Sequence, residues 1–187
     1  MTAYDLPTSL NIGGVERPIR TGWRVVMDIF AMFNDPDFDN EMKTVGLIKM
    51  LYPQWREIPS EDMPEAVEKA CDFLDCGQKA DEICCPKIVD WEQDAPLIIP
   101  AINGVVGTEV RANPNIHWWT FFGWYMSIEK SLFSSVLLIR QKKAEGKKLS
   151  KREQEWYKKN RNLVNMKKRL SKEDKEALDY FNKWLYR

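Results

Sequence analysis

Histidine is almost absent from this chain, since His117 is the only one among 187 residues. A lone histidine without a serine or cysteine motif beside it offers no nucleophile–base pair. The sequence also lacks a nucleophile elbow, a phosphate-binding loop and a zinc-protease motif. Asp90, Glu92 and Asp94 cluster, but they share a predicted helix start, where acids are favoured by the helix dipole. We predict that the protein is not an enzyme and needs no cofactor, and that His117 makes an ordinary hydrogen bond at a helix start.

Cysteines are few and are not spaced like structural zinc ligands. Cys71, Cys76, Cys84 and Cys85 form the pattern C-x4-C-x7-C-C, which contains no C-x2-C pair. Without a secretory signal, such cysteines are more often free thiols than disulfides. A zinc site is the alternative interpretation. We expect reduced cysteines and no metal, with Cys71 packed in the core.

No stretch is apolar enough to cross a membrane, which takes about 18 uncharged apolar residues. Residues 117–128, HWWTFFGWYMSI, come closest, and Glu129 and Lys130 interrupt the run. The first residues, MTAYDLPTSLNIGG, lack the basic region and apolar run of a secretory signal. We expect a cytosolic protein without membrane contact.

Basic and acidic residues balance over the whole chain, with 28 of each, but they are unevenly distributed. Residues 140–187 hold 17 Lys and Arg against 7 Asp and Glu, which leaves 11 against 21 in residues 1–139. Such asymmetry indicates a partner or self-association. We divide the chain into an acidic, mainly helical body, residues 1–141, and a basic amphipathic helical arm, residues 142–187.

The apolar spacing predicts a mainly α fold that begins with a short β-hairpin. Leu10 and Ile12 alternate with polar residues, and Gly13-Gly14 suits a two-residue turn. Helical spacing predicts a first helix over about residues 23–33 and a second over about 41–51, in which Val45 is expected to face the core. Capping residues predict a third helix after the N-cap Ser60 and a fourth after the N-cap Asp90, with a kink at Pro100.

The aromatic stretch 117–128 is expected to form the core. It holds three tryptophans, two phenylalanines and a tyrosine. Helical spacing predicts one long helix from about Asn113 to Gln141, and a helix that is apolar on nearly all sides is buried centrally in a soluble fold. We therefore predict a helical bundle around a central aromatic helix.

The arm carries two predicted amphipathic helices. Ser150 with Glu153 forms a capping box for the first, and Ser171 with Asp174 starts the second. Both helices have few apolar residues per turn, so each needs a partner surface to bury its apolar stripe. The predicted interaction residues are Trp156, Tyr157, Lys158, Lys159, Phe181 and Trp184.

Three interpretations of the arm remain open. It docks on an acidic surface such as the body of a sister subunit, it binds nucleic acid, or it is a solvated helical face. Lysine and arginine interleaved with aromatic residues suit phosphates and bases. The arm also carries acids and no recognised nucleic-acid motif, so we favour a protein partner.

Several blocks of the chain resemble one protein family. They are YDLPTSLNIGGVERPIRT (4–21), LYPQWREIP (51–59), VDWEQDAPLIIPAIN (89–103), IHWWTFFGWYMSI (116–128) and IRQKKAEGKKLSKREQEWY (139–157). Over about residues 4–165 they resemble tailed-phage proteins first named as gene product fifteen of a Listeria phage. DWEQD and HWWTF are the most specific blocks. The cysteine-bearing loop, residues 76–86, is peculiar to this chain.

The resemblance implies a role in tail assembly. Genes of this family lie between those for the tail tube protein and the tape measure, a position typical of tail assembly chaperones. A chaperone of this kind binds the hydrophobic tape measure protein, keeps it soluble and passes it to the polymerising tail tube protein of siphophage-type tails.

The same resemblance yields further expectations. The protein would form a homo-oligomer, act in the cytoplasm of the infected bacterial host and be absent from the mature virion. A minor virion component and a nucleic-acid-binding phage protein that uses the basic arm are the alternatives. The resemblance supplies no catalytic residues.

Overall fold

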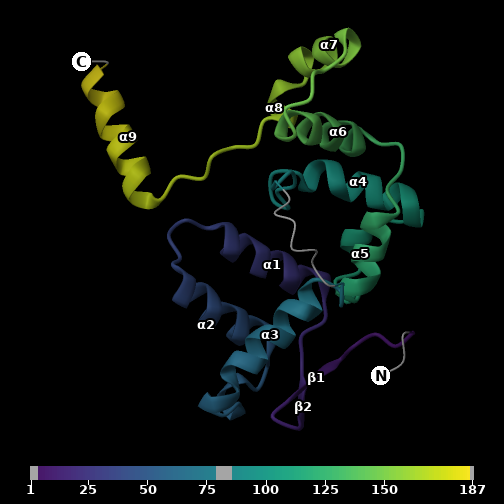
Figure 1. Cartoon of the computed structure of the whole chain (residues 1–187), viewed down its shortest axis with the longest axis vertical. Helices are drawn as coiled ribbons and strands as arrows, with labels where there is room; N and C mark the ends of the chain where they lie inside the picture. Colours follow the sequence, from purple (N-terminus) through teal and green to yellow (C-terminus); the bar gives the residue numbers. More distant parts are fainter. Residues whose placement is uncertain (1–3, 79–85, 186–187) are drawn as a thin grey trace.

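The computed structural model describes residues 4–78 and 86–185, with the side chains of 179, 180 and 182–185 left out. The described chain is mainly helical and begins with a β-hairpin, as predicted. Figure 1 shows the hairpin and the first three helices on one side, the next five helices on the other, and the last helix standing apart.

The hairpin follows from its glycine pair. Strands β1 (Ser9–Ile12) and β2 (Val15–Pro18) pair antiparallel, with Ile12 opposite Val15. Gly13 and Gly14 have φ values of 57° and 78°, and two left-handed residues give the type I′ turn that matches strand twist. The Gly13 N–H donates to the Glu65 carboxylate at 2.9 Å, which fixes the turn against the third helix. The predicted hairpin is confirmed.

The first three helices form the lower part of the core. They are α1 (Trp23–Asn34), α2 (Asn40–Leu51) and α3 (Met63–Leu74). The short 3-10 helices η1 (Trp55–Glu57) and η2 (Ser60–Asp62) connect α2 to α3. The buried residues of the three helices are Trp23, Val26, Ile29, Leu47, Ile48, Leu51, Ala66, Ala70, Phe73 and Leu74.

Three predictions in this region are wrong. Val45 is 44% exposed, because α2 packs through the face that carries Leu47 and Ile48. Ser60 is not the N-cap of α3, since residues 60–62 first form the turn η2. Cys71 is exposed rather than packed in the core, because Ala70 and its neighbours on the same face of α3 make the inward contact.

The aromatic stretch forms a short helix rather than part of a long one. Helix α5 (Trp118–Met126) ends where the Ser127 hydroxyl donates to the Gly123 carbonyl at 2.8 Å. Helix α6 (Leu132–Ala144) begins with a reciprocal capping box between Ser131 and Ser134. The predicted helix from Asn113 to Gln141 is therefore wrong, because serine side chains satisfy backbone groups that a continuous helix would use.

The predicted burial of the aromatic stretch is confirmed in part, because Trp118 and Phe121 are buried, most of the other residues are half-buried, and Met126 is 61% exposed. Trp118 and Phe121 are each 1% exposed, and the Phe121 ring stacks on Trp23 with centroids 4.6 Å apart. The indole N–H groups of Trp118 and Trp119 donate to the last carbonyls of α3, at 2.8 and 2.9 Å. The stretch, which forms α5, thus packs against α1 and α3.

Helix α4 (Ala95–Val106) packs between α5 and α6. It begins at Ala95 and not after Asp90, so the predicted start is wrong; residues 90–94 form a separate turn. The helix continues through Pro100 and ends at Gly107, which has a left-handed φ of 74°. The 3-10 helix η3 (Val110–Ala112) leads on toward α5.

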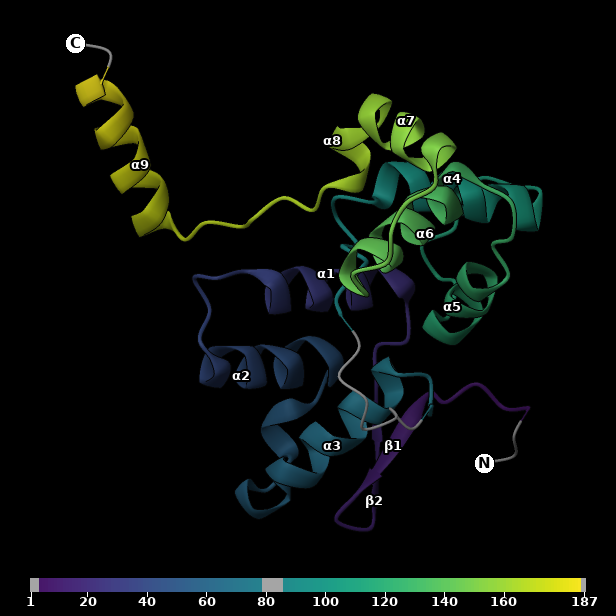
Figure 2. The ribbon, with the colours of Figure 1, turned by 45° about the horizontal axis from the view of Figure 1, so that its top comes forward.

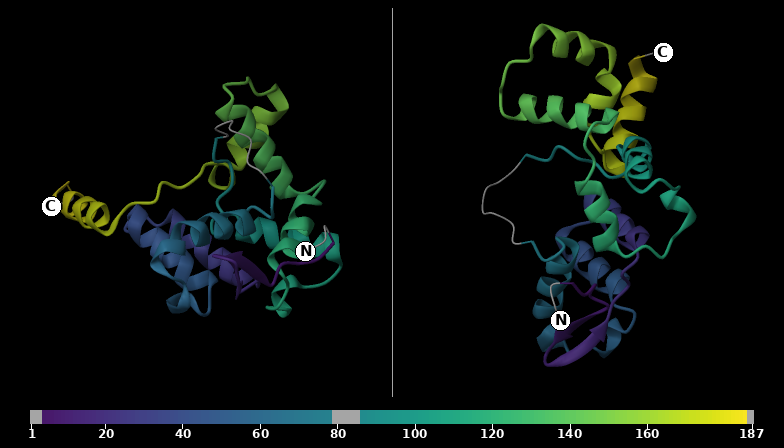
Figure 3. Two further views of the ribbon diagram at one scale, coloured as in Figure 1. Left: turned by 60° about the horizontal axis from the view of Figure 1, so that its bottom comes forward. Right: turned by 90° about the vertical axis from the view of Figure 1, so that its right-hand side faces the viewer.

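The arm forms two separate structures. Helices α7 (Lys151–Lys159) and α8 (Arg161–Val164) fold back on α6, and the predicted capping box of α7 is present. A connector, residues 165–171, then leads to α9 (Lys172–Leu185), which stands apart from the other helices in Figures 1 and 2 and in the left view of Figure 3. Among the described residues no helix has the length and apolarity that a membrane span requires.

Candidate functional site

The DWEQD turn, residues 90–94, lies where α4, α6 and the connector meet. Its last residue, Asp94, forms a buried ion pair with Arg140 of α6, and their side chains are 1% and 4% exposed. The two contacts measure 2.6 Å from Nη1 to Oδ2 and 2.9 Å from Nη2 to Oδ1. Bidentate arginine–carboxylate pairs of this kind are both strong and directional.

The remaining donors of Arg140 are also satisfied. The guanidinium donates to the carbonyl oxygens of Val164 at 2.7 Å, Ile88 at 2.8 Å and Leu163 at 2.7 Å. All five N–H groups of the side chain therefore have an acceptor. Arg140 thus ties α6 to α8 and to the segment that precedes α4.

The first residues of the turn hold the connector. Arg169 donates to Asp90 at 2.8 Å and also pairs with Glu92. The Gln93 side-chain amide binds the connector at two points. It donates to the Asn165 carbonyl at 2.9 Å and accepts from the Lys167 N–H at 2.8 Å. The path of the chain toward α9 is therefore fixed by the DWEQD turn.

The environment of Asp90 favours its ionised form. Burial alone would raise the pKa of this carboxyl group. Hydrogen bonds from the Gln93 backbone and from Arg169, with the positive charge of Arg169, outweigh burial and hold the pKa below its ordinary value. Asp90, Glu92 and Asp94, which we expected to be stabilised by a helix dipole, are thus partners in ion pairs.

Trp91 connects the same turn to the core. Its ring lies 4.8 Å from that of Tyr125, 5.9 Å from that of Trp118 and 5.9 Å from that of Phe30, measured between centroids. These contacts reach α1 and α5. With charged contacts on one side and aromatic contacts on the other, the turn holds the start of α4 in place.

The outer face of α4 is uncharged and open to solvent. Residues 95–108 contain no charged side chain. Ile98, Ile99 and Ile102 face the core, while Pro96, Pro100, Gly104 and Val105 are exposed. An exposed face of this kind, without charge along a whole helix, is typical of a protein–protein contact.

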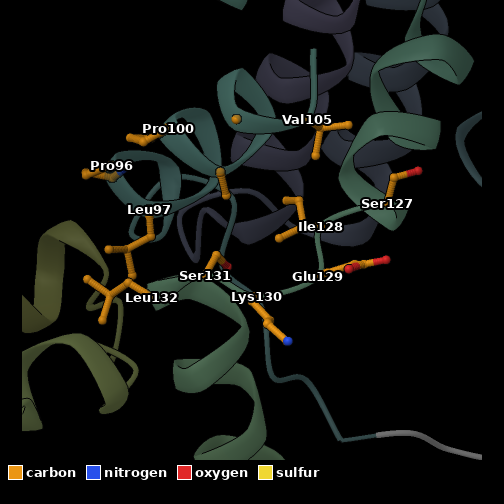
Figure 4. Close-up of a pocket in the computed structure, with 12 residues that line it drawn as sticks. Pro96, Leu97, Pro100, Val105, Ser127, Ile128, Glu129, Lys130, Ser131 and Leu132 are labelled. Carbon is orange, nitrogen blue, oxygen red and sulfur yellow. The ribbon is translucent and has the colours of Figure 1, made fainter. Parts of the chain in front are cut away.

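Two hollows flank this face, and each combines apolar residues with a charged pair: Glu129 and Lys130 in the first, Glu92 and Arg111 in the second. One, of about 720 Å³, lies between α4 and residues 127–132 (Figure 4). The other, of about 550 Å³, lies on the opposite side of α4, and both hollows include Pro96 and Pro100. We call the exposed face and its two hollows the α4 surface. Its main apolar lining residues are Leu97, Val105, Ile128 and Leu132 in the first hollow, and Trp23, Met27, Trp91 and Phe121 in the second.

The predicted interaction residues lie on two separate parts of the arm. Trp156 and Tyr157 of α7 are half-buried against a small cluster around Ile139, and the exposed Lys158 and Lys159 end the same helix. Phe181 is 52% exposed on α9, which lies apart from α7 (Figure 1). The side chain of Trp184 lies outside the described residues.

The aromatic ring of Tyr157 already has charged neighbours. The Lys143 ammonium lies 4.1 Å from the ring centroid and donates to the Tyr157 hydroxyl at 2.8 Å. The Arg161 guanidinium lies 5.8 Å from the same centroid. Stacking of a base on this ring would have to displace these cations.

His117 occupies the position predicted for it. Its Nδ1 accepts from the Trp119 N–H at 3.1 Å as the N-cap of α5, so Nε2 carries the proton and donates to the Pro7 carbonyl at 2.9 Å. Nδ1 thus caps α5, and Nε2 holds the N-terminal segment on it. The predicted hydrogen bond at the helix start is confirmed.

The described part of the chain holds no cluster of three or more His, Cys, Asp or Glu residues that suits a metal ion. Cys76 is half-buried, and burial together with the charge of Asp75 raises the pKa of its thiol to about 12. Cys84 and Cys85 lie outside the described residues.

Comparison with known proteins identifies one family. A family model described as bacteriophage Gp15 protein matches residues 3–166. The matched range includes α1 to α8 and ends within the connector, so α9 lies beyond it. No curated protein and no solved structure matches the chain.

Proposed function

The chain belongs to the bacteriophage Gp15 protein family, and on this premise we propose that it is a tail assembly chaperone. In this proposal it binds the tape measure protein in the cytoplasm of the infected host and assists assembly of the tail tube protein around it. The protein then leaves before the virion is complete. The observation that carries the proposal is the α4 surface.

The α4 surface suits the recognition of an apolar helix. A chaperone for a long hydrophobic protein must cover apolar side chains and must itself stay in solution. Helix-in-groove recognition meets this need, because side chains at helical spacing enter apolar hollows beside a supporting helix. Residues 95–108 offer such a support without charge, and the apolar lining residues of the hollows on both sides would contact the side chains of a bound helix.

Rigid attachment of α4 strengthens the argument. The ion pair between Asp94 and Arg140 and the packing of Trp91 hold the start of the helix. A preformed surface loses little conformational entropy when it binds, so more of the interaction free energy remains for the ligand. This arrangement supports a binding role.

Co-expression with the tape measure protein of the same phage tests the proposal. Wild-type protein is expected to keep the tape measure protein soluble and to co-purify with it. Val105→Glu places a charge in the α4 surface at a residue that is 41% exposed, so it should reduce co-purification without unfolding the chain. Leu138→Glu is the matched control, since Leu138 is 48% exposed on α6 and does not line either hollow.

Two results would overturn the proposal. In one, the tape measure protein stays insoluble and this protein purifies alone. In the other, the Val105→Glu variant co-purifies as well as wild type does. Presence of the protein in purified virions would instead support the alternative of a minor virion component.

A nucleic-acid role has less support. The Tyr157 ring faces Lys143 and Arg161, and Trp156 is half-buried, so neither aromatic residue offers a bare face for base stacking. Binding of DNA or RNA that weakens steeply with salt would favour this alternative.

A further inference from the structure

An apolar face of α2 lies open to solvent, apart from the α4 surface. Met42 and Val45 are 53% and 44% exposed on this helix, and Phe38, which lies just before it, is 39% exposed. The three side chains line a hollow of about 490 Å³ together with Asp39, Glu41, Gly46 and Lys49. We call the residues that line this hollow the α2 face. Apolar side chains that gather on one exposed face are typical of a contact with another protein.

The spacing of the α2 face is that of a seam between two helices. Val45 follows Met42 by three residues and precedes Lys49 by four, and Phe38 precedes Met42 by four. Residues at alternating intervals of three and four form one stripe along a helix, and such stripes pack against each other in paired helices. The opposite side of α2, which carries Leu47, is already packed in the core of the same copy.

The start of the α2 face is acidic. Four acids lie within seven residues there: Asp35, Asp37, Asp39 and Glu41. Among the described residues no cation forms an ion pair with any of them. Lys43 is half-buried on the side of Leu47, and Lys87 donates to the Asn34 side chain. The first turn of α9 begins beside Asp37 and adds two lysines and two acids, so the start keeps a net negative charge.

The end of α2 is basic. The side chains of Lys49 and Arg56 lie over the Trp55 ring, 5.1 and 4.7 Å from its centroid, and Arg20 donates to two carbonyl oxygens near the helix end. Glu57, the nearby acid, forms an ion pair with β2 at 3.6 Å. The three cations therefore give this end of the helix a net positive charge.

Opposite charges at the two ends make the α2 face complementary to itself. In an antiparallel pair with a two-fold axis between Met42 and Val45, each Met42 packs on Val45 of the other copy. Lys49 of each copy then lies beside Phe38 of the other copy, where the acidic start provides the opposite charge. A parallel pair would place acid on acid and lysine on lysine, which is unfavourable. The helix dipoles favour the antiparallel pair as well.

We infer that two copies of this chain dimerise through their α2 faces, with the two α2 helices antiparallel. The contact uses the same surface on both copies, so it closes at two copies. A single pair of short helices buries less than the roughly 1,200–2,000 Å² of a stable interface, so the dimer should be weak and its formation should depend on concentration. The inference thus names the surface of the homo-oligomer that the sequence led us to expect.

The dimer would carry two α4 surfaces. In Figures 1 and 2, α2 lies with α1 and α3 and away from α4, so the contact leaves the α4 surface of each copy uncovered. Two linked surfaces bind one long protein more tightly than a single surface does, because the second contact forms at a high effective concentration. This consequence rests on the proposed function, whereas the dimer rests on the α2 face alone.

Sedimentation velocity tests the inference. The weight-average mass of the full chain is expected to rise with concentration from that of a monomer to that of a dimer and no further. Val45→Glu brings a carboxylate against Met42 of the other copy at two symmetric places, so dimerisation should weaken about tenfold or more. Leu138→Glu is the matched control, because Leu138 is 48% exposed on α6, and it should dimerise like wild type.

A charge exchange tests the antiparallel arrangement. Glu41→Lys adds a cation to the acidic start, and Lys49→Glu adds an acid to the basic end, so each variant alone should dimerise several-fold more weakly than wild type. In an equimolar mixture the two chains attract each other at both ends, so mixed dimers should form more tightly than dimers of either variant. Glu155→Lys, a charge reversal at an exposed residue of α7, is the control and should dimerise like wild type.

Three results would overturn the inference. They are a wild type that stays monomeric, assembly of wild type beyond a dimer, and association of Val45→Glu as strong as that of wild type. A mixture that associates no more tightly than its two variants alone would overturn the antiparallel arrangement. Because Glu41 and Lys49 are exposed, the charge exchange remains informative even if Val45→Glu fails to fold.

The dimer and the chaperone proposal fail separately. If wild type dimerises while the tape measure protein stays insoluble on co-expression, the dimer stands and the chaperone proposal does not. If wild type stays monomeric while the tape measure protein co-purifies with it, the chaperone proposal stands and the dimer does not.

Discussion

Replacement of Arg140 by methionine should make the protein unfold at a lower temperature and a lower urea concentration. Methionine retains most of the side-chain volume but leaves the Asp94 carboxylate, whose side chain is 1% exposed, without its cation. Breaking a buried ion pair by removal of one partner costs roughly 3–5 kcal/mol. Three carbonyl oxygens also lose their donor, so the upper part of that range is expected.

Urea and thermal unfolding, followed by circular dichroism, measure this loss. For a chain of this size, 1 kcal/mol shifts Tm by about 2–4 °C, so Arg140→Met should lower Tm by roughly 6–20 °C. Arg152→Met is the control, because Arg152 is exposed on α7 and an exposed substitution changes stability by about 0.5 kcal/mol or less.

A double variant separates the effect of the unpaired buried charge from that of the lost hydrogen bonds to the carbonyl oxygens. Asp94→Asn removes the charge and keeps an oxygen that accepts from the Asp90 N–H, a contact of 2.9 Å. The Arg140→Met/Asp94→Asn chain should be more stable than Arg140→Met, with a coupling of about 0.5–3 kcal/mol in the double-variant cycle. The reasoning is refuted if Arg140→Met costs less than about 1 kcal/mol, or if the cycle shows no coupling.

Two further predictions concern the arm. Arg169→Gln should speed amide hydrogen exchange in the connector, because its ion pairs with the DWEQD turn are lost. Lys168→Gln is the control, because Lys168 is exposed and its replacement should leave the exchange rate unchanged. Equal exchange rates in the two variants would refute the role of Arg169. Hydrogen bonds from Lys142 and from the Ser150 backbone lower the pKa of Glu153 to about 2. Because the pKa is lower in the folded chain, the stabilisation is fully present above the ordinary value near 4.5 and is lost as pH falls from there to about 2. The stability difference between wild type and Glu153→Gln should therefore be constant at neutral pH and shrink across that range, and a pH-independent difference measured by urea unfolding would contradict the assignment.

Local rules in the sequence predict the elements that depend on near neighbours. The Gly13-Gly14 turn, the capping box of Ser150 with Glu153 and the hydrogen bond of His117 at a helix start each follow from contacts within a few residues, and the structure contains all three. The break between α5 and α6 also depends on near neighbours, but apolar spacing does not reveal it. Apolar spacing runs on across Ser127, while the serine side chains satisfy the backbone and end the helix.

The ion pairs of the DWEQD turn could not be predicted from spacing. Arg140 lies 46 residues from Asp94 and Arg169 lies 79 residues from Asp90, so no local pattern joins them. The uncharged run over residues 95–108 is visible in the sequence, and it was the available signal for the α4 surface. Its exposure depends on how α4 packs against α5 and α6, which the sequence pattern does not specify.

Hydrogen exchange of the co-purified complex tests the central claim, that the α4 surface binds the tape measure protein. Compared with the chain alone, the complex should show slower exchange in residues 95–106 and 127–132, with α7 and α8 unchanged. Protection confined to α7 and α8, with α4 exchanging as in the free chain, would contradict the account. Failure to obtain any complex from co-expression would contradict it as well.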